Sequence, residues 1–129
     1  MRYGWVWGLA LAGPLAAQEV TVGECRPAGG YGLNQPTFDM IECDLTNEGQ
    51  VPVAGVNYTA SFTEANRTVP WAEIVGRPTR ISGGIEPGET APILLQGQYL
   101  SGRADPSRVR INLRITEAFD VNGDSIPPE

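Results

Sequence analysis

Three oxygen-bearing side chains near the C-terminal end of the chain have the clearest potential for chemistry. Asp120, Asn122 and Asp124 alternate in the segment DVNGD. Calcium loops of the EF-hand type use carboxylate and amide oxygens at alternate positions. Ser125 stands where such a loop carries glycine, and an Asn-Gly pair also favours a tight turn between strands. Calcium bound by this segment is therefore a candidate cofactor, and a hairpin turn is the alternative interpretation.

A row of arginines forms the second candidate site. Arg108, Arg110 and Arg114 lie on one face of a predicted strand, and an alternating row of apolar residues lies on the other face. Such a row can bind an anionic partner or a carboxylate ligand. Alternatively, the arginines pair with acids on neighbouring strands, for which Glu42 and Asp44 are candidates. Each such pair contributes about 0.2–1 kcal/mol.

Two other segments are candidate contact regions for a partner. The first surrounds Trp71, which is the only tryptophan after the first seventeen residues. The second is the glycine-rich loop Gly29–Asn34.

The missing residue types exclude most enzyme classes. The chain has no histidine and no lysine, and all nine basic residues are arginine. Without imidazole or amine groups, the usual general bases, the nucleophilic triads and imidazole metal sites are absent. A hydrolase built on carboxylates alone remains an alternative, and we expect no enzyme activity. The net charge of −6 also disfavours nucleic acid and anionic lipid surfaces as partners.

The first seventeen residues have the layout of a secretory signal peptide. Arg2 provides the positive start, an apolar stretch runs from Trp5 to Leu15, and a pair of alanines follows. The apolar stretch is shorter than the roughly 20 residues that a membrane-spanning helix needs. We expect cleavage after Ala17, no stable membrane insertion after cleavage, and a periplasmic or secreted protein. Residues 18–129 then form a single domain.

In an exported protein the two cysteines are expected to form a structural disulfide. Cys25 and Cys43 are the only cysteines, and an even pair in an oxidising compartment predicts a disulfide. The alternative, a zinc site, needs four ligands, which two thiols without histidine cannot supply. We expect the bridge to stabilise the fold by roughly 3 kcal/mol.

Alternating polar and apolar residues dominate the chain after the leader. The predicted strands lie at residues 18–25, 41–46, 56–63, 93–99 and 108–115. A further apolar patch begins at Ile81, and a short strand or an irregular segment begins near Val69. Turn signals separate these segments, and no helical period of useful length is present. The pattern predicts an all-β fold: an Ig-like antiparallel β-sandwich of six to seven strands with one disulfide.

The segment from Cys43 to Ile93 carries turn motifs in a specific order. One strand ends in N-x-G at Asn47, an alternating strand follows, and I-x-P-G-E begins at Ile85. This order resembles the Ig-like accessory domains of bacterial envelope proteins, such as the FxLYD and CARDB families. The segment FTEAN, which begins at Phe62, occupies the place of the motif that names the FxLYD family. The resemblance implies a non-catalytic module that mediates adhesion, assembly or ligand contact.

These observations predict an exported, non-catalytic binding or accessory module that contacts another protein or an envelope component. Such a module can bind through its loops or through an exposed strand edge. A small-ligand or calcium-binding domain that uses the turn 120–124 is the first alternative. A carboxylate-based hydrolase is the second.

Overall fold

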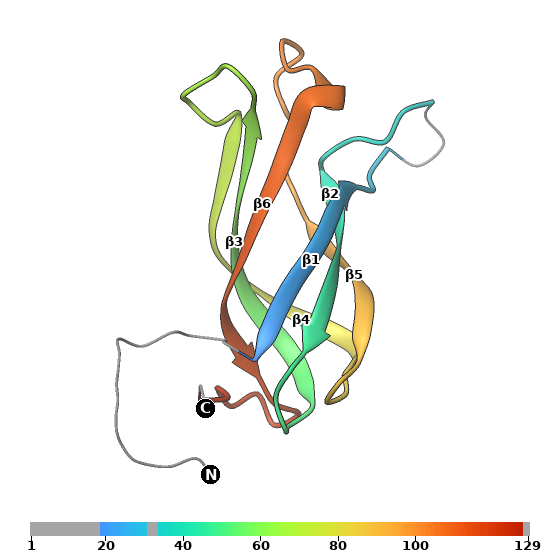
Figure 1. Cartoon of the computed structure of the whole chain (residues 1–129), viewed down its shortest axis with the longest axis vertical. Helices are drawn as coiled ribbons and strands as arrows, with labels where there is room; N and C mark the ends of the chain where they lie inside the picture. The colour runs from blue at the N-terminus through green and yellow to red at the C-terminus, as the bar shows by residue number, and fades with distance from the viewer. Residues whose placement is uncertain (1–18, 31–33, 128–129) are drawn as a thin grey trace.

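The computed structural model describes residues 19–30 and 34–127, and this part of the chain is all-β (Figure 1). Its six strands are β1 (Val20–Pro27), β2 (Met40–Asn47), β3 (Val53–Glu64), β4 (Ala72–Ile85), β5 (Thr90–Gln96) and β6 (Val109–Phe119). They form two antiparallel three-stranded sheets, ordered β1-β2-β5 and β4-β3-β6. The predicted signal peptide, residues 1–17, lies outside the described residues.

The core lies between the two sheets because each central strand turns alternate side chains inward. In β2, Ile41, Cys43 and Leu45 are fully buried, as the alternation predicted. The central strand of the other sheet, β3, contributes Tyr58 and Phe62, which are the largest fully buried side chains. The result is a β-sandwich-like arrangement in which both central strands are covered by the opposing sheet.

The predicted disulfide is confirmed. Cys25 and Cys43 are directly opposite each other on β1 and β2, and their Cα atoms are 4.1 Å apart. Next to the bridge, the Arg26 guanidinium contacts Glu42 at 2.8 Å and Asp44 at 3.0 Å. These two acids were candidate partners for the arginines near the end of the chain. That pairing is wrong, because Glu42 and Asp44 already bind an arginine within their own sheet.

The strand β4 is longer than the sequence predicts. It runs from Ala72 to Ile85, whereas the sequence indicated a short strand or an irregular segment near Val69 and a separate apolar patch from Ile81. Gly76, with φ of 67°, and Pro78 interrupt the alternating pattern between these points. An edge strand tolerates such residues because one of its sides needs no hydrogen bonds. A prediction from alternating residues therefore underestimates the length of an irregular edge strand.

The strand β5 ends earlier than the sequence predicts. Tyr99 was expected on the same strand face as Leu95, but β5 stops at Gln96 and Tyr99 is exposed. Gly97 follows β5 and passes close to the Phe38 carbonyl oxygen, where a Cβ atom would collide with it. Beyond the end of β5, the N–H groups of Gly97 and Gln98 still donate to the carbonyl oxygens of Asp39 and Phe38, both at 2.8 Å.

Buried polar contacts join the turns at the end of the sandwich where β2 finishes. The Asn47 side chain is fully buried. Its Nδ2 donates to the carbonyl oxygens of Val51 and Ile85, both at 2.9 Å. Its Oδ1 accepts from the Gly49 N–H at 2.9 Å. The N-x-G motif is therefore a structural clamp that fixes the β2–β3 turn against the end of β4.

Candidate binding surface at the loop end of the sandwich

Three loops gather at one end of the sandwich, which we call the loop end (Figure 1). They are the β1–β2 loop (28–39), the β3–β4 loop (65–71) and the β5–β6 loop (97–108). Strands β2, β4 and β6 begin here and β1, β3 and β5 finish here, so the connections are brought together by the topology. All three loops contain residues of the sequence-predicted sites.

Trp71 is held in place at the end of the β3–β4 loop, directly before β4. Its backbone N–H donates to the Phe62 carbonyl at 2.8 Å, and its indole Nε1 donates to Glu64 Oε1 at 2.8 Å. The Arg67 guanidinium carbon lies 3.9 Å from the centroid of the Trp71 ring. The guanidinium of Arg103, from the β5–β6 loop, lies 5.3 Å from it. The indole is thus ordered by one carboxylate and two cations, and cation–π contact of this kind contributes about 0.5–1 kcal/mol at exposed sites.

Glu64 connects the two loops. Its Oε1 also accepts the backbone N–H of Asp105 at 3.1 Å. The hydrogen bonds from Asp105 and then from the Trp71 indole lower the pKa of the Glu64 carboxyl below its usual value. The carboxylate therefore stays ionised and acts as an acceptor that orders the surface, which does not suit a general acid.

A shallow hollow continues this surface between the β1–β2 and β5–β6 loops. Its volume is about 350 Å³, and its walls include Pro36, Phe38, Tyr99, Leu100 and Pro106. The Tyr99 side chain at its rim is 73% exposed. The loop end thus combines a half-exposed indole, an exposed phenol and a mainly apolar hollow.

The two ends of the sandwich differ in charge although the chain as a whole is acidic. Of the eight arginines that the structure describes, three lie in the loops of the loop end, Arg67, Arg103 and Arg108, together with two carboxylates, Asp39 and Asp105. The described turns at the opposite end, 48–52, 86–89 and 120–127, contain five carboxylates and no arginine. Each molecule therefore has a charge asymmetry along its long axis that favours an acidic partner at the loop end.

The three sequence-predicted arginines are not equivalent. Arg108 ends a single 3-10 turn, Pro106–Arg108, so its placement in the strand was wrong. Asp105 caps this turn by accepting the Ser107 N–H, and the strand begins only at Val109. Arg110 and Arg114 are exposed on the outer face of β6, as predicted.

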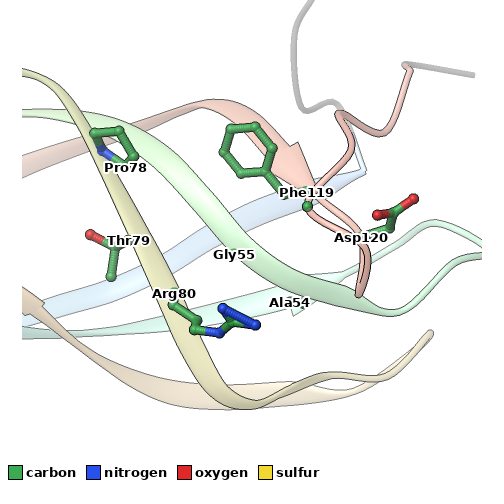
Figure 2. Close-up of a pocket in the computed structure, with 8 residues that line it drawn as sticks. Ala54, Gly55, Pro78, Thr79, Arg80, Phe119 and Asp120 are labelled. Carbon is green, nitrogen blue, oxygen red and sulfur yellow. The ribbon is translucent and has the colours of Figure 1, made fainter.

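A second hollow lies near the opposite end of the sandwich (Figure 2). It has a volume of about 310 Å³ and lies between the segments 54–55, 78–80 and 119–123. Pro78 and Phe119 form apolar walls, and Arg80 and Asp120 carry opposite charges at its edge (Figure 2). Gly55 allows β3 and β4 to approach closely here, because a Cβ atom at this position would lie 3.0 Å from the Thr79 carbonyl oxygen.

The predicted calcium segment forms a tight turn beside this hollow. Asp120 Oδ1 accepts the backbone N–H groups of Asn122 at 2.9 Å and Asp124 at 3.0 Å. Gly123 adopts φ of 84°, which suits glycine. The Asp120 N–H donates to the Asp124 carbonyl at 2.9 Å, as in the hairpin alternative. Within residues 19–30 and 34–127, no three His, Cys, Asp or Glu side chains are arranged to hold a metal. Calcium binding here stays a prediction.

Sequence reasoning found Trp71 but missed the residues around it. Arg67, Arg103 and Glu64 reach the indole from two loops, and no local motif predicts contact between them. The one available signal was the spacing of Glu64 and Trp71 across a short polar turn, which indicates a hairpin. Of the glycine-rich loop Gly29–Asn34, residues 31–33 are not described, so its contribution stays a prediction.

No α-helix among the described residues is long and apolar enough to span a membrane. Comparisons of the chain with protein-family models, with curated proteins and with solved structures give no match.

Proposed function

We propose that this chain is an exported, non-catalytic Ig-like binding module that contacts another protein or an envelope component through its loop end. One observation carries the proposal: Trp71 is held half-exposed between loops by Glu64, with Arg67 and Arg103 against its ring. Tryptophan, tyrosine and arginine are the residues that most often dominate binding energy at protein interfaces. A pre-ordered surface also loses less conformational entropy when a partner binds.

The order of the strands supports the Ig-like part of the proposal. Three of the connections, β2–β3, β4–β5 and β5–β6, pass from one sheet to the other. In Ig-type sandwiches the chain likewise alternates between sheets, and binding loops cluster at one end. The resemblance to FxLYD and CARDB domains suggests the same arrangement. Here the disulfide joins neighbouring strands of one sheet, so the match concerns topology and not the inter-sheet bridge of antibody domains.

Disulfide bonding and composition support export and a non-catalytic role. The Cys25–Cys43 bridge is typical of proteins that fold in an oxidising compartment, which agrees with the predicted leader at residues 1–17. The chain has no histidine or lysine to act as a base. The carboxyl with the clearest role at the loop end, Glu64, has a lowered pKa and accepts hydrogen bonds from two loops.

Site-specific photo-cross-linking in the native envelope tests the proposal. Val69 at the loop end and Val121 at the opposite end are 66% and 67% exposed, so they form a matched pair. We expect benzoylphenylalanine at position 69 to give one discrete adduct and the same group at position 121 to give none. Adducts at both positions in equal yield, or at neither, would contradict binding through the loop end.

A second candidate function is small-ligand or calcium binding at the turn 120–124. The hollow in Figure 2 bears on the small-ligand form of this function, since Asp120 and Arg80 stand at the edge of an apolar space of about 310 Å³. Millimolar calcium should then raise the melting temperature, because a ligand that binds only the folded state stabilises it. Asp120→Asn keeps the Oδ1 acceptor of the turn and should abolish the shift. An unchanged melting temperature of the wild-type protein excludes calcium.

A further inference from the structure

The four strands at the sheet edges differ in how their edges are protected. Edge strands of natural proteins are commonly interrupted by proline, glycine or bulges, which prevent pairing with other chains. Three of the edges follow this rule, through Gly23 and Pro27 in β1, Gly76, Pro78, Gly83 and Gly84 in β4, and Pro92 in β5. The fourth edge strand, β6, contains neither glycine nor proline, and its one register shift against β3 lies at Thr116, between Ile115 and Glu117.

Within the described residues, the chain itself pairs with only the last part of the free edge of β6. After the turn at 120–124, Ser125 bridges Phe119, and the Ile126 N–H donates to the Ala118 carbonyl at 2.8 Å. Pro127 follows, and proline has no N–H to continue a ladder. Nothing in the described chain hydrogen-bonds as a strand to the edge from Val109 to Thr116. The neighbouring β1 belongs to the other sheet and diverges from β6 toward the loop end (Figure 1).

The two faces of this free edge have different chemistry. On the inner face, Val109, Ile111 and Leu113 pack against the core but remain partly exposed. On the outer face, Arg110 and Arg114 are exposed. Their cross-strand neighbours on β3 are Thr63 and Thr59, and neither arginine forms a salt bridge within the described chain.

We propose that the β6 edge, Val109–Thr116, accepts an extended segment of a partner protein as an added strand, with apolar and acidic residues alternating in that segment. The apolar residues would cover Ile111 and Leu113 and extend the sandwich, and the acidic residues would face Arg110 and Arg114. Opposite charges across a strand pair stabilise it, and like charges destabilise it. This inference rests on the proposed function only in that the protein binds other proteins, because the edge lies along β6 and begins beyond Arg108, the last residue of the loop end.

A second copy of this chain is a poor occupant of the edge. Antiparallel pairing of two β6 strands about Asn112 would set Arg110 of each copy opposite Arg114 of the other. The small interface would then contain two pairs of arginines, and the two positive charges of each pair would face each other. The arginines that attract an acidic strand therefore also oppose self-association.

The test uses two synthetic peptides of equal length, one alternating valine with glutamate and one alternating valine with lysine. We expect the glutamate peptide to bind the mature protein and to slow amide hydrogen exchange at Val109–Thr116. The double variant Arg110→Glu/Arg114→Glu should bind the glutamate peptide about tenfold more weakly and should prefer the lysine peptide. The matched control, Arg77→Glu/Arg80→Glu, makes the same charge change on β4 at the other edge of the sheet.

The proposal is overturned if the glutamate peptide does not bind, or if it binds both double variants equally. It is also overturned if exchange slows elsewhere but not along β6. Cross-linking from position 69 provides the separate measurement of the loop end. Loss of the adduct there with retained peptide binding would reject the loop-end function alone, and the reverse result would reject strand addition alone.

Discussion

Replacing Asn47 with alanine should cost far more stability than removing a polar side chain from the exposed faces of the sheets. The side chain is fully buried and makes three hydrogen bonds, to the Val51 and Ile85 carbonyls and from the Gly49 N–H. A buried hydrogen bond contributes about 1 kcal/mol net, and its loss leaves the partner unsatisfied. The three losses together predict a decrease in the free energy of unfolding of about 3 kcal/mol. That decrease would lower the urea midpoint by about 2 M at a slope of roughly 1.5 kcal/mol/M.

Urea unfolding of the disulfide-bonded mature protein measures this effect. Asn112→Ala is the matched control, because Asn112 Nδ2 also donates to side chains, Thr63 at 3.1 Å and Ser61 at 3.4 Å, but on the exposed face. The control should change stability by less than about 0.5 kcal/mol. Asn47→Asp keeps the volume and the acceptor while removing the donor, so it should also be strongly destabilised near neutral pH. Equal losses for the alanine variants at 47 and 112 would refute the clamp.

Three other predictions concern the core, the bridge and the loop end. Tyr58→Phe removes the buried hydroxyl that donates to the Gln96 carbonyl at 2.8 Å and should cost about 1 kcal/mol in urea unfolding, whereas the exposed Tyr99→Phe should cost almost nothing. Reducing the disulfide should lower the free energy of unfolding by about 3 kcal/mol, and an unchanged urea midpoint would contradict its structural role. Because the folded-state pKa of Glu64 is lowered, its contribution is complete above its usual value of 4.5 and is lost as pH falls through the folded-state pKa. The wild type should therefore exceed Glu64→Gln in free energy of unfolding by less in acid than near neutral pH. A constant difference from pH 6 to pH 3 would argue against stabilisation by the ionised Glu64 carboxylate.

The sequence predicted the strands whose two faces lie in different environments. In β2, β3 and β6 one face meets the core and the other meets water, so the period of two is clear and both the strands and the inward Cys43 were predicted correctly. The same logic fails at the irregular edge β4, where Gly76 and Pro78 break the alternation. It also fails at the end of β5, because the strand stops at Gln96 and Tyr99 lies beyond it.

The loop-end surface could be predicted only in part because its residues meet through the topology. Trp71 stood out as a single large residue, but Arg103 lies 32 positions away and reaches the ring from another loop. The amino-acid composition does not indicate which arginines lie together at the loop end. For the row at Arg110 and Arg114, the alternation gave the correct face, whereas the identity of neighbouring acids required the strand order.

The most direct test of binding through the loop end combines the position-69 cross-link with neutral substitutions of the two arginines on the indole. Arg67→Gln/Arg103→Gln removes both cations from the Trp71 ring, and Arg77→Gln/Arg80→Gln removes two charges elsewhere as the matched control. If the loop end binds the partner, the discrete adduct from position 69 falls steeply in the first variant and persists in the second. An adduct of unchanged yield in both variants would contradict binding through the loop end, because the partner would then not depend on the ordered indole–arginine surface.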